Sequence, residues 1–336
     1  MAVREHKLIN NPENLIDEML EGFCAAYADI LLCGDNRLVM RAEPKVAGKV
    51  GLLMGSGSGH EPAMLGWVGE GLFDVVVAGE VFAAPGPENM LAGVRAADRG
   101  GGVLICVSHH AGDLLNAELT LEFCEIEGID DVDMVLLYDD ISSAPKGREA
   151  ERRGTAGLFS VWKMLGAFCE GDADLAAAKA LAEKVRDNTR SLAVSLSSCA
   201  SPMTGEAMFE MGADEMEIGM GLHGELGMGR QKALGADATI DLLLPPLLED
   251  LPYRAGDEVI VLLNSSGSLT LMELFILYRR AAARLSEAGV SVYRSWIGQY
   301  ATTLETAGFA LALCRVDEQL KALWDAPANG AYMKQL

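Results

Sequence analysis

Residues 48–62 have the sequence GKVGLLMGSGSGHEP, a short apolar run that ends in a glycine-rich loop. Such a run is typical of a buried strand that delivers its loop to the end of a sheet. Three more short apolar runs follow, FDVVVAGEVFA (73–83), GGGVLICVS (100–108) and VDMVLLYDD (132–140), with helical patterns between them at 86–98 and 113–127. This alternation predicts an α/β fold whose strands are buried on both faces.

A second set of elements is predicted in the remainder of the chain. Short strands recur at 192–198, 214–223, 258–264 and 308–316, and a helix spans about 269–288. The proline-marked segment LLLPPLLEDLPYRAGDE (242–258) is expected to be a loop. We therefore predict two α/β domains with mixed sheets flanked by helices, over residues 1–185 and 186–336.

Composition and charge exclude several classes of function. Half of the 336 residues are apolar, and 27 basic against 49 acidic residues give a formal charge of −22. Such a surface repels phosphate backbones and anionic lipid, so we expect neither nucleic acid nor a membrane as a partner. The seven cysteines are scattered without a C-x-x-C pair, and the first 23 residues lack the apolar core of a signal peptide. These features predict a reducing, cytoplasmic location and no structural zinc.

The glycine loop GSGSGHEP (55–62) is not a nucleotide-binding motif, because no lysine follows it and the G-x-G-x-x-G spacing is missing. One interpretation is a tight turn that requires positive φ angles. The other is a ligand cradle, because His60 lies on a small-residue loop where α/β sheets place ligands.

The segment DEMEIGMGLHGELG (214–227) alternates in period two and is predicted to be a strand that carries His223. Gly219 and Gly221 would lie on the same face as His223 and leave space beside its ring. A lone histidine usually has a structural role, whereas an adjacent space favours a ligand.

Further motifs occur with these in a fixed order: KLINNPENLIDEMLEGF (7–23), GDLLN (112–116), RRGTAG (152–157) and ALWDAPA (322–328). Together the motifs resemble those of the substrate-binding subunit of dihydroxyacetone kinases, over essentially the full length of the chain. The resemblance implies a two-domain α/β fold of the Dak1 and DegV type, and a homodimer.

The resemblance also implies roles for individual residues. His223 would attack the ketone of dihydroxyacetone and hold it as a covalent hemiaminal. Asp113 would be the base for the hydroxyl that is phosphorylated, and His60 would assist. The hydroxyl groups of the substrate would be held by a larger set: Gly57, Ser58, Gly59, Ser108, His109, His110 and Gly112.

The resemblance implies that no cofactor binds to this chain. ATP or ADP with Mg²⁺ would lie on a separate helical nucleotide-binding subunit, which a phosphotransferase-system protein could recharge. The substrate would be a short ketose, and the activity that of a glycerone-type kinase in glycerol and carbohydrate metabolism.

The stretch GGGVLICVSHHAGDLLN (100–116) departs from the family pattern. The family has Lys-Asn-Tyr-Thr where this chain has Ser108, His109, His110 and Ala111, so a substrate-binding lysine is missing. We interpret the change as an altered substrate, such as the four-carbon ketose erythrulose. Alternatively, one of the adjacent histidines packs and the other faces solvent. A metal site made of His60, His109, His110 and Asp113 is a third, less favoured alternative, and we predict no metal.

Three functions therefore stay open. The first is the ketose-binding half of a kinase, which the retained Asp113 favours. The second is a non-catalytic, ketose-sensing relative that regulates a transcription factor, which the missing lysine favours. The third is an isomerase that uses the same covalent adduct.

Overall fold

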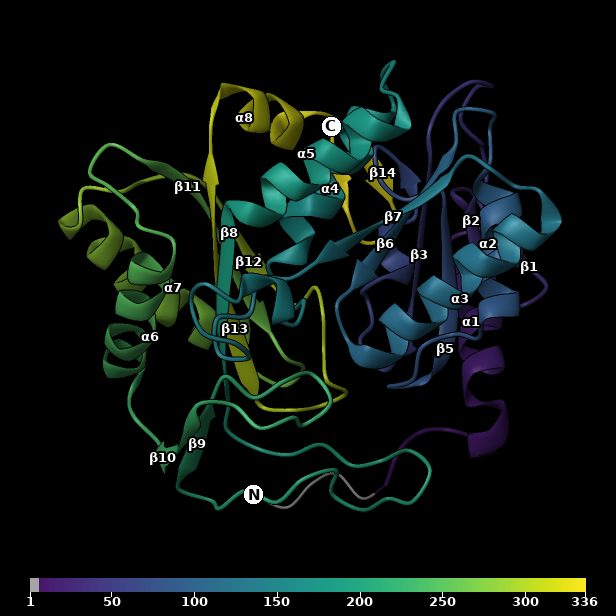
Figure 1. The fold of residues 1–336 in the computed structure, drawn as a ribbon. Helices are drawn as coiled ribbons and strands as arrows, with labels where there is room; N and C mark the ends of the chain where they lie inside the picture. The colour runs from purple at the N-terminus through teal and green to yellow at the C-terminus, as the bar shows by residue number, and fades with distance from the viewer. Residues whose placement is uncertain (1–5) are drawn as a thin grey trace. The chain divides into compact units, whose positions relative to one another are not determined.

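The computed structural model describes residues 6–336, which form two compact units (Figure 1). The glycine-loop unit comprises residues 9–137, 159–185 and 320–336, and the histidine unit comprises residues 6–8, 138–158 and 186–319. The two units interleave along the chain: 138–158 belongs with the later segment and 320–336 with the earlier one. A single cut near residue 185 therefore does not separate them.

The glycine-loop unit is built on a six-stranded sheet of order β1-β2-β5-β3-β6-β7. Its strands are β1 (Leu31–Gly34), β2 (Leu38–Arg41), β3 (Gly51–Ser58), β5 (Val75–Val81), β6 (Val103–Ser108) and β7 (Val132–Leu137). The four predicted strands β3, β5, β6 and β7 are parallel, whereas β1 and β2 pair antiparallel. A small sheet of β15 (Lys334–Gln335), β14 (Ala328–Gly330) and β4 (Gly69–Glu70) completes the strands of this unit.

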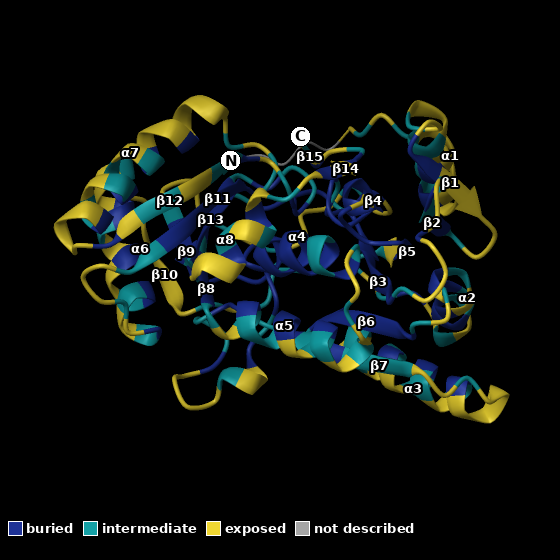
Figure 2. Ribbon diagram, turned by 90° about the horizontal axis from the view of Figure 1, so that it is seen from above, coloured by how far each residue is buried: buried dark blue, intermediate teal, exposed yellow. Residues whose placement is uncertain are grey.

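Helices cover this sheet, whose central strands β3 and β6 are buried along their whole length. α2 (Pro87–Ala97) and α3 (Ala111–Glu127) lie side by side on one face and share a core with β3, β5 and β6. α1 (Leu15–Ala26), α4 (Leu158–Cys169), α5 (Leu175–Asp187) and α8 (Glu318–Asp325) lie wholly or almost wholly in this unit. Figure 2 shows that β3 and β6 are buried, whereas parts of α3 are exposed.

The histidine unit contains a second six-stranded sheet, of order β10-β9-β8-β13-β11-β12. Its strands are β8 (Thr189–Ser195), β9 (Glu215–Ile218), β10 (Gly229–Lys232), β11 (Glu258–Ser265), β12 (Ser291–Gly298) and β13 (Gly308–Val316). Only β11 and β12 are parallel among these neighbours. α6 (Ala236–Asp250) and α7 (Leu271–Glu287) pack together on this sheet and share its core. The predicted class, α/β with mixed sheets flanked by helices, is confirmed.

Two sequence predictions in this unit are wrong. The expected loop at 242–258 is helix α6 as far as Asp250, and it contains Pro245 and Pro246. Proline removes a helix donor, but burial of Leu243, Leu244 and Leu247 outweighs that loss. The expected strand at 214–223 ends at Ile218, because the next residue, Gly219, has φ +75°.

The cysteines also differ from the expectation of scattered thiols. Cys24 on α1 and Cys33 on β1 form a disulfide with their Cα atoms 6.1 Å apart. The other five cysteines are buried and lie outside this disulfide. Within residues 6–336, no helix combines the length and the apolar character needed to cross a bilayer.

Candidate functional site

The first four residues of the predicted glycine loop (55–62) are the end of strand β3, and the loop itself begins at Gly59. This segment packs against the end of β5 and the residues that follow it. A Cβ atom on Gly57 would lie 2.6 Å from the backbone nitrogen of Ala83, so only glycine fits this close approach. Ser58 Oγ donates a hydrogen bond of 2.8 Å to the carbonyl oxygen of Gly79, and Gly59 has φ +97°. The tight-turn interpretation and the ligand-cradle interpretation are therefore compatible, since the turn fixes the backbone that a ligand would contact.

His60 ends this loop in a buried position. Only 1% of its surface is exposed, and its ring stacks on that of Phe82 with centroids 4.9 Å apart. The next residue, Glu61, folds back so that both of its carboxylate oxygens accept from the backbone nitrogen of Gly59 at 3.1 Å. Burial raises the pKa of Glu61. The loop is thus held from both sides, and Phe82 is a contact that the sequence analysis missed.

Asp113 lies on the neighbouring strand–helix connection. β6 ends at Ser108, and Asp113 lies in the first turn of α3. Ser108 Oγ donates a hydrogen bond of 3.0 Å to Asp113 Oδ2. The amino end of a helix favours a carboxylate there. The parallel strands β3 and β6 therefore bring the glycine loop and Asp113 to the same edge of one sheet.

The two adjacent histidines connect β6 to α3. The backbone nitrogen of His109 donates to the carbonyl oxygen of Leu137 at 3.1 Å, which extends the pairing of β6 with β7. His110 is the N-cap residue of α3, and its carbonyl oxygen accepts from the nitrogen of Leu114 at 3.0 Å. Both histidines are half-buried. Gly112 lies in the first turn of the same helix.

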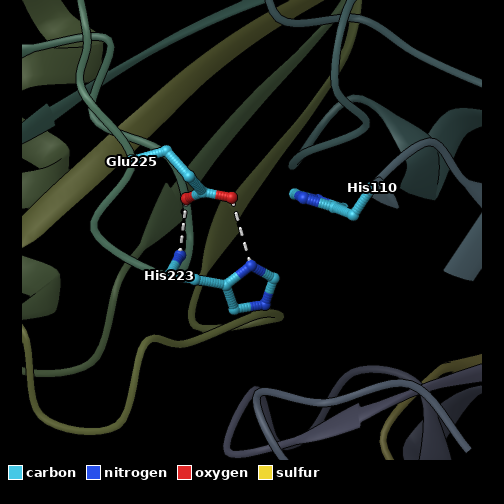
Figure 3. A group of neighbouring side chains, drawn as sticks. All are labelled: His110, His223 and Glu225. Atoms are coloured by element: carbon cyan, nitrogen blue, oxygen red, sulfur yellow. Dashed lines mark hydrogen bonds and ion pairs between the residues drawn. The ribbon is translucent and has the colours of Figure 1, made fainter. Parts of the chain in front are cut away.

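His223 belongs to the histidine unit and lies in a loop, not on a strand as predicted. The loop joins β9 to β10 and turns sharply at Gly224, whose φ is +85°. Figure 3 shows how the carboxylate of Glu225 holds this histidine. Glu225 Oε2 accepts from the backbone nitrogen of His223 at 2.9 Å, and Glu225 Oε1 lies 3.2 Å from Nδ1 of its ring. The side chain of His223 is 26% exposed.

Gly221 has a different role from the one predicted. The sequence indicated that it leaves space for a ligand beside His223. In the structure a Cβ atom at this position would overlap Glu225 Oε2 and lie 2.5 Å from Nη1 of Arg153. The space beside Gly221 is therefore filled by these two charged groups.

Arg153, the second residue of the RRGTAG motif, contacts the loop that carries His223. Its Nη1 lies 3.9 Å from Glu225 Oε2, and its Nη2 donates to Asp140 Oδ2 at 2.8 Å and to the carbonyl oxygen of Gly219 at 3.1 Å. Asp140 also accepts from the backbone nitrogen of Ser142 at 2.9 Å. Arg153 lies in RRGTAG (152–157) and Glu225 in DEMEIGMGLHGELG (214–227), but no local pattern predicts a role for either residue, because their contact depends on how the loop folds.

The predicted residues are divided between the two units. His60, Ser108 and Asp113 belong to the glycine-loop unit, and His223 belongs to the histidine unit. Within the described residues, the four side chains that the metal alternative requires do not supply three ligand atoms close enough to hold one ion. That alternative has no support in the geometry.

The chain consists of two α/β units, one with a glycine loop and one with a histidine held by a carboxylate. The Dak1 domain family matches residues 21–332, and the chain belongs to this family. The chain is 39% identical to the dihydroxyacetone-binding subunit DhaK of the PTS-dependent dihydroxyacetone kinase 2 of Listeria innocua, over 98% of this chain and 99% of that protein.

Two other matches bear on function. The chain is 36% identical to the L-erythrulose kinase of Pectobacterium atrosepticum, over 96% of this chain but 55% of that protein. Among solved structures it resembles the dihydroxyacetone kinase operon co-activator DhaQ with a TM-score of 0.89 and 28% identity, covering 95% of this chain and 98% of that one. Kinases and a co-activator therefore both share this fold.

Proposed function

We propose that this chain is the ketose-binding subunit of a dihydroxyacetone-kinase-type phosphotransferase. The observation that carries the proposal is the partly exposed imidazole of His223, held at Nδ1 by Glu225 in a chain of the Dak1 family. With a proton on Nδ1, the lone pair of the ring is on Nε2, and a neutral imidazole is nucleophilic enough to add to a carbonyl. Glycerol has no carbonyl group, so covalent capture selects ketoses over polyols of the same size.

The chemistry then proceeds in two steps. Nε2 of His223 bonds to the ketone carbon as the carbonyl π pair moves to oxygen, which takes a proton. Asp113 then accepts the proton of a primary hydroxyl as that oxygen bonds to the phosphorus of the donor and the bond from phosphorus to the donor's leaving phosphate oxygen breaks, with His60 assisting. The backbone of the glycine loop, Ser108 to His110 and Gly112 hold the remaining hydroxyl groups.

The substrate we favour is dihydroxyacetone or a four-carbon ketose such as erythrulose. The buried hydroxyl of Ser108 stands where the family has a lysine, which removes a cation and several ångströms of side chain. A shorter neutral side chain leaves room for a longer ketose. The similarity to an L-erythrulose kinase supports this choice.

The phosphoryl group would come from ATP, or from an ADP that has first been phosphorylated, held with Mg²⁺ on a separate helical subunit. The name of the Listeria relative, a binding subunit, supports such a division between subunits. A phosphotransferase-system protein is the expected source of phosphate for that partner. We further propose that the chain acts as a homodimer in the cytoplasm.

A second candidate function is ketose sensing without catalysis. The similarity to the DhaQ co-activator favours it, because that protein has nearly the same length and fold. The chain would then bind a ketose through His223 and regulate a transcription factor.

One experiment tests both candidates. The purified chain is incubated with ketoses of three to six carbons, and adducts are detected by intact mass and by crystallography. Phosphoryl transfer is then measured with a nucleotide-binding subunit encoded beside it. An adduct with turnover supports the kinase, and an adduct without turnover for any partner supports the sensor. Absence of any adduct on His223 would overturn both.

A further inference from the structure

The two contacts between Glu225 and His223 involve different parts of the histidine. One carboxylate oxygen accepts from the backbone nitrogen at 2.9 Å and fixes the position of the residue. The other lies 3.2 Å from Nδ1 and fixes the rotation of the ring (Figure 3). A carboxylate accepts hydrogen bonds and cannot donate them, so this contact requires the proton of the neutral ring to be on Nδ1.

The surroundings keep the carboxylate of Glu225 in place. Arg153 Nη1 lies 3.9 Å from it, and the side chain of Arg153 is only 13% exposed. Arg153 is held in turn by Asp140, whose side chain is 4% exposed, and by the carbonyl oxygen of Gly219. Glycine at position 221 leaves the room in which the two charged groups meet. The buried Arg153–Asp140 ion pair and Gly221 together orient the carboxylate of Glu225.

We infer that Glu225 is a positioning residue for His223, an inference that rests on the proposed function. Glu225 holds the proton on Nδ1, so that Nε2 is the nucleophile. When Nε2 bonds to the ketone carbon, the carbonyl oxygen takes a proton from water and the ring keeps the proton on Nδ1. The ring then carries one positive charge, which the carboxylate compensates. Glu225 therefore stabilises the adduct more than it stabilises the unreacted histidine.

Two variants separate orientation from charge. Glu225→Gln keeps an oxygen that can accept from Nδ1 but removes the negative charge, whereas Glu225→Ala removes both. The fraction of His223 that carries a dihydroxyacetone adduct is measured at a fixed ketose concentration, and it gives the equilibrium constant for adduct formation. Relative to the wild type, we expect this constant to be about 10-fold lower in Glu225→Gln and about 100-fold lower in Glu225→Ala. Glu287→Gln, on the exposed end of α7, is the matched control and should not differ from the wild type.

The tautomer of the ring is a readout that a merely structural role would not change. In ¹⁵N NMR spectra of the ketone-free protein, His223 should be protonated at Nδ1 in the wild type and in Glu225→Gln. In Glu225→Ala the proton should move to Nε2, the nitrogen that imidazole side chains favour in water. Thermal unfolding checks that all three proteins are folded.

The outcomes distinguish this inference from the proposed function. If the wild type forms no adduct with any ketose, the proposed function fails. If the wild type forms the adduct and Glu225→Ala is folded with the same tautomer and the same adduct constant, the inference is overturned. A lower constant together with a changed tautomer supports it.

Discussion

The hydroxyl of Ser108 donates a hydrogen bond of 3.0 Å to the carboxylate of Asp113 across the junction of β6 and α3. Asp113 therefore has a neutral, short partner at the position where the pattern of the family that the chain resembles has a lysine. A cation would stabilise the carboxylate and weaken it as a base, whereas a hydroxyl does so less. Under the proposed function, serine at this position would leave more room for a substrate than lysine, and it places no cation at position 108 beside Asp113.

Ser108→Lys should shift substrate preference toward dihydroxyacetone. The longer cationic side chain would fill the space that we assign to the fourth carbon of erythrulose. We expect the ratio of adduct constants, erythrulose over dihydroxyacetone, to fall by about tenfold or more. Intact-mass titration with each ketose measures it. Ser108→Ala, which removes the hydroxyl without adding bulk, should leave the ratio near the wild-type value, and an unchanged ratio in Ser108→Lys would contradict the assignment.

Asp113→Asn should separate binding from phosphoryl transfer. Asparagine keeps the shape of the side chain and can still accept from Ser108, but it cannot take a proton from the substrate. We expect the equilibrium constant for adduct formation to stay within about twofold of the wild-type value. We expect the rate of phosphoryl transfer to fall by about 100-fold or more. Turnover with the nucleotide-binding partner measures the second quantity.

The control for Asp113→Asn is Asp133→Asn on β7, where the carboxylate pairs with Lys179 at 2.8 Å in the same unit. It should change neither adduct nor turnover. Turnover of Asp113→Asn close to that of the wild type would exclude Asp113 as the base.

Gly221→Ala tests the packing around Glu225. The added methyl group would overlap Glu225 Oε2 and the guanidinium of Arg153, so the carboxylate must move away from Nδ1 of His223. We expect the equilibrium constant for adduct formation to fall by about tenfold. Gly235→Ala is the control, since a Cβ atom there has nothing within 4 Å. If Gly221→Ala is folded and keeps the wild-type adduct constant, the close packing has no role in orienting Glu225.

Sequence patterns predicted the parallel strands of the glycine-loop unit. β5 and β6 lie where their apolar runs predicted, and β7 occupies the first six residues of its run. β3 continues to Ser58, four residues into the segment that was expected to be a loop. The edge strand β12 was missed because most of its residues are partly exposed and its apolar pattern is weak. Helix α6 was missed because Pro245 and Pro246 outweighed the surrounding leucines in the interpretation.

The candidate site was predictable only in part, for a related reason. His60, Asp113 and His223 stand in motifs that can be recognised along the chain. Glu225 and Arg153 are 72 positions apart by their numbering, and their meeting depends on a left-handed turn and on the glycine that makes room for it. Local patterns contain no signal for such a contact, because it arises only when separate loops pack together.

Lys163 on α4 provides a prediction about stability. Its side chain is fully buried, and its ammonium donates to the carbonyl oxygens of Leu323 at 3.1 Å and Ala326 at 2.7 Å. Burial lowers the pKa of Lys163 to about 8, and nearby Asp325 only partly opposes this effect. Between that value and the ordinary value of 10.5 for a lysine, the unfolded chain binds more protons than the folded chain. The contribution of Lys163 to stability is therefore lowest below pH 8 and rises as the pH increases toward 10.5.

Comparison with Lys163→Met isolates this contribution, because other groups that titrate in the same range cancel. We expect the free energy of unfolding of the wild type, minus that of the variant, to increase by about 1.5 kcal/mol between pH 8 and pH 9.5. Urea unfolding at each pH measures the difference. Lys179→Met, which removes a partly exposed lysine paired with Asp133, should show no such increase. A difference that stays constant or falls with pH would mean that Lys163 is not held in the folded protein with a lowered pKa.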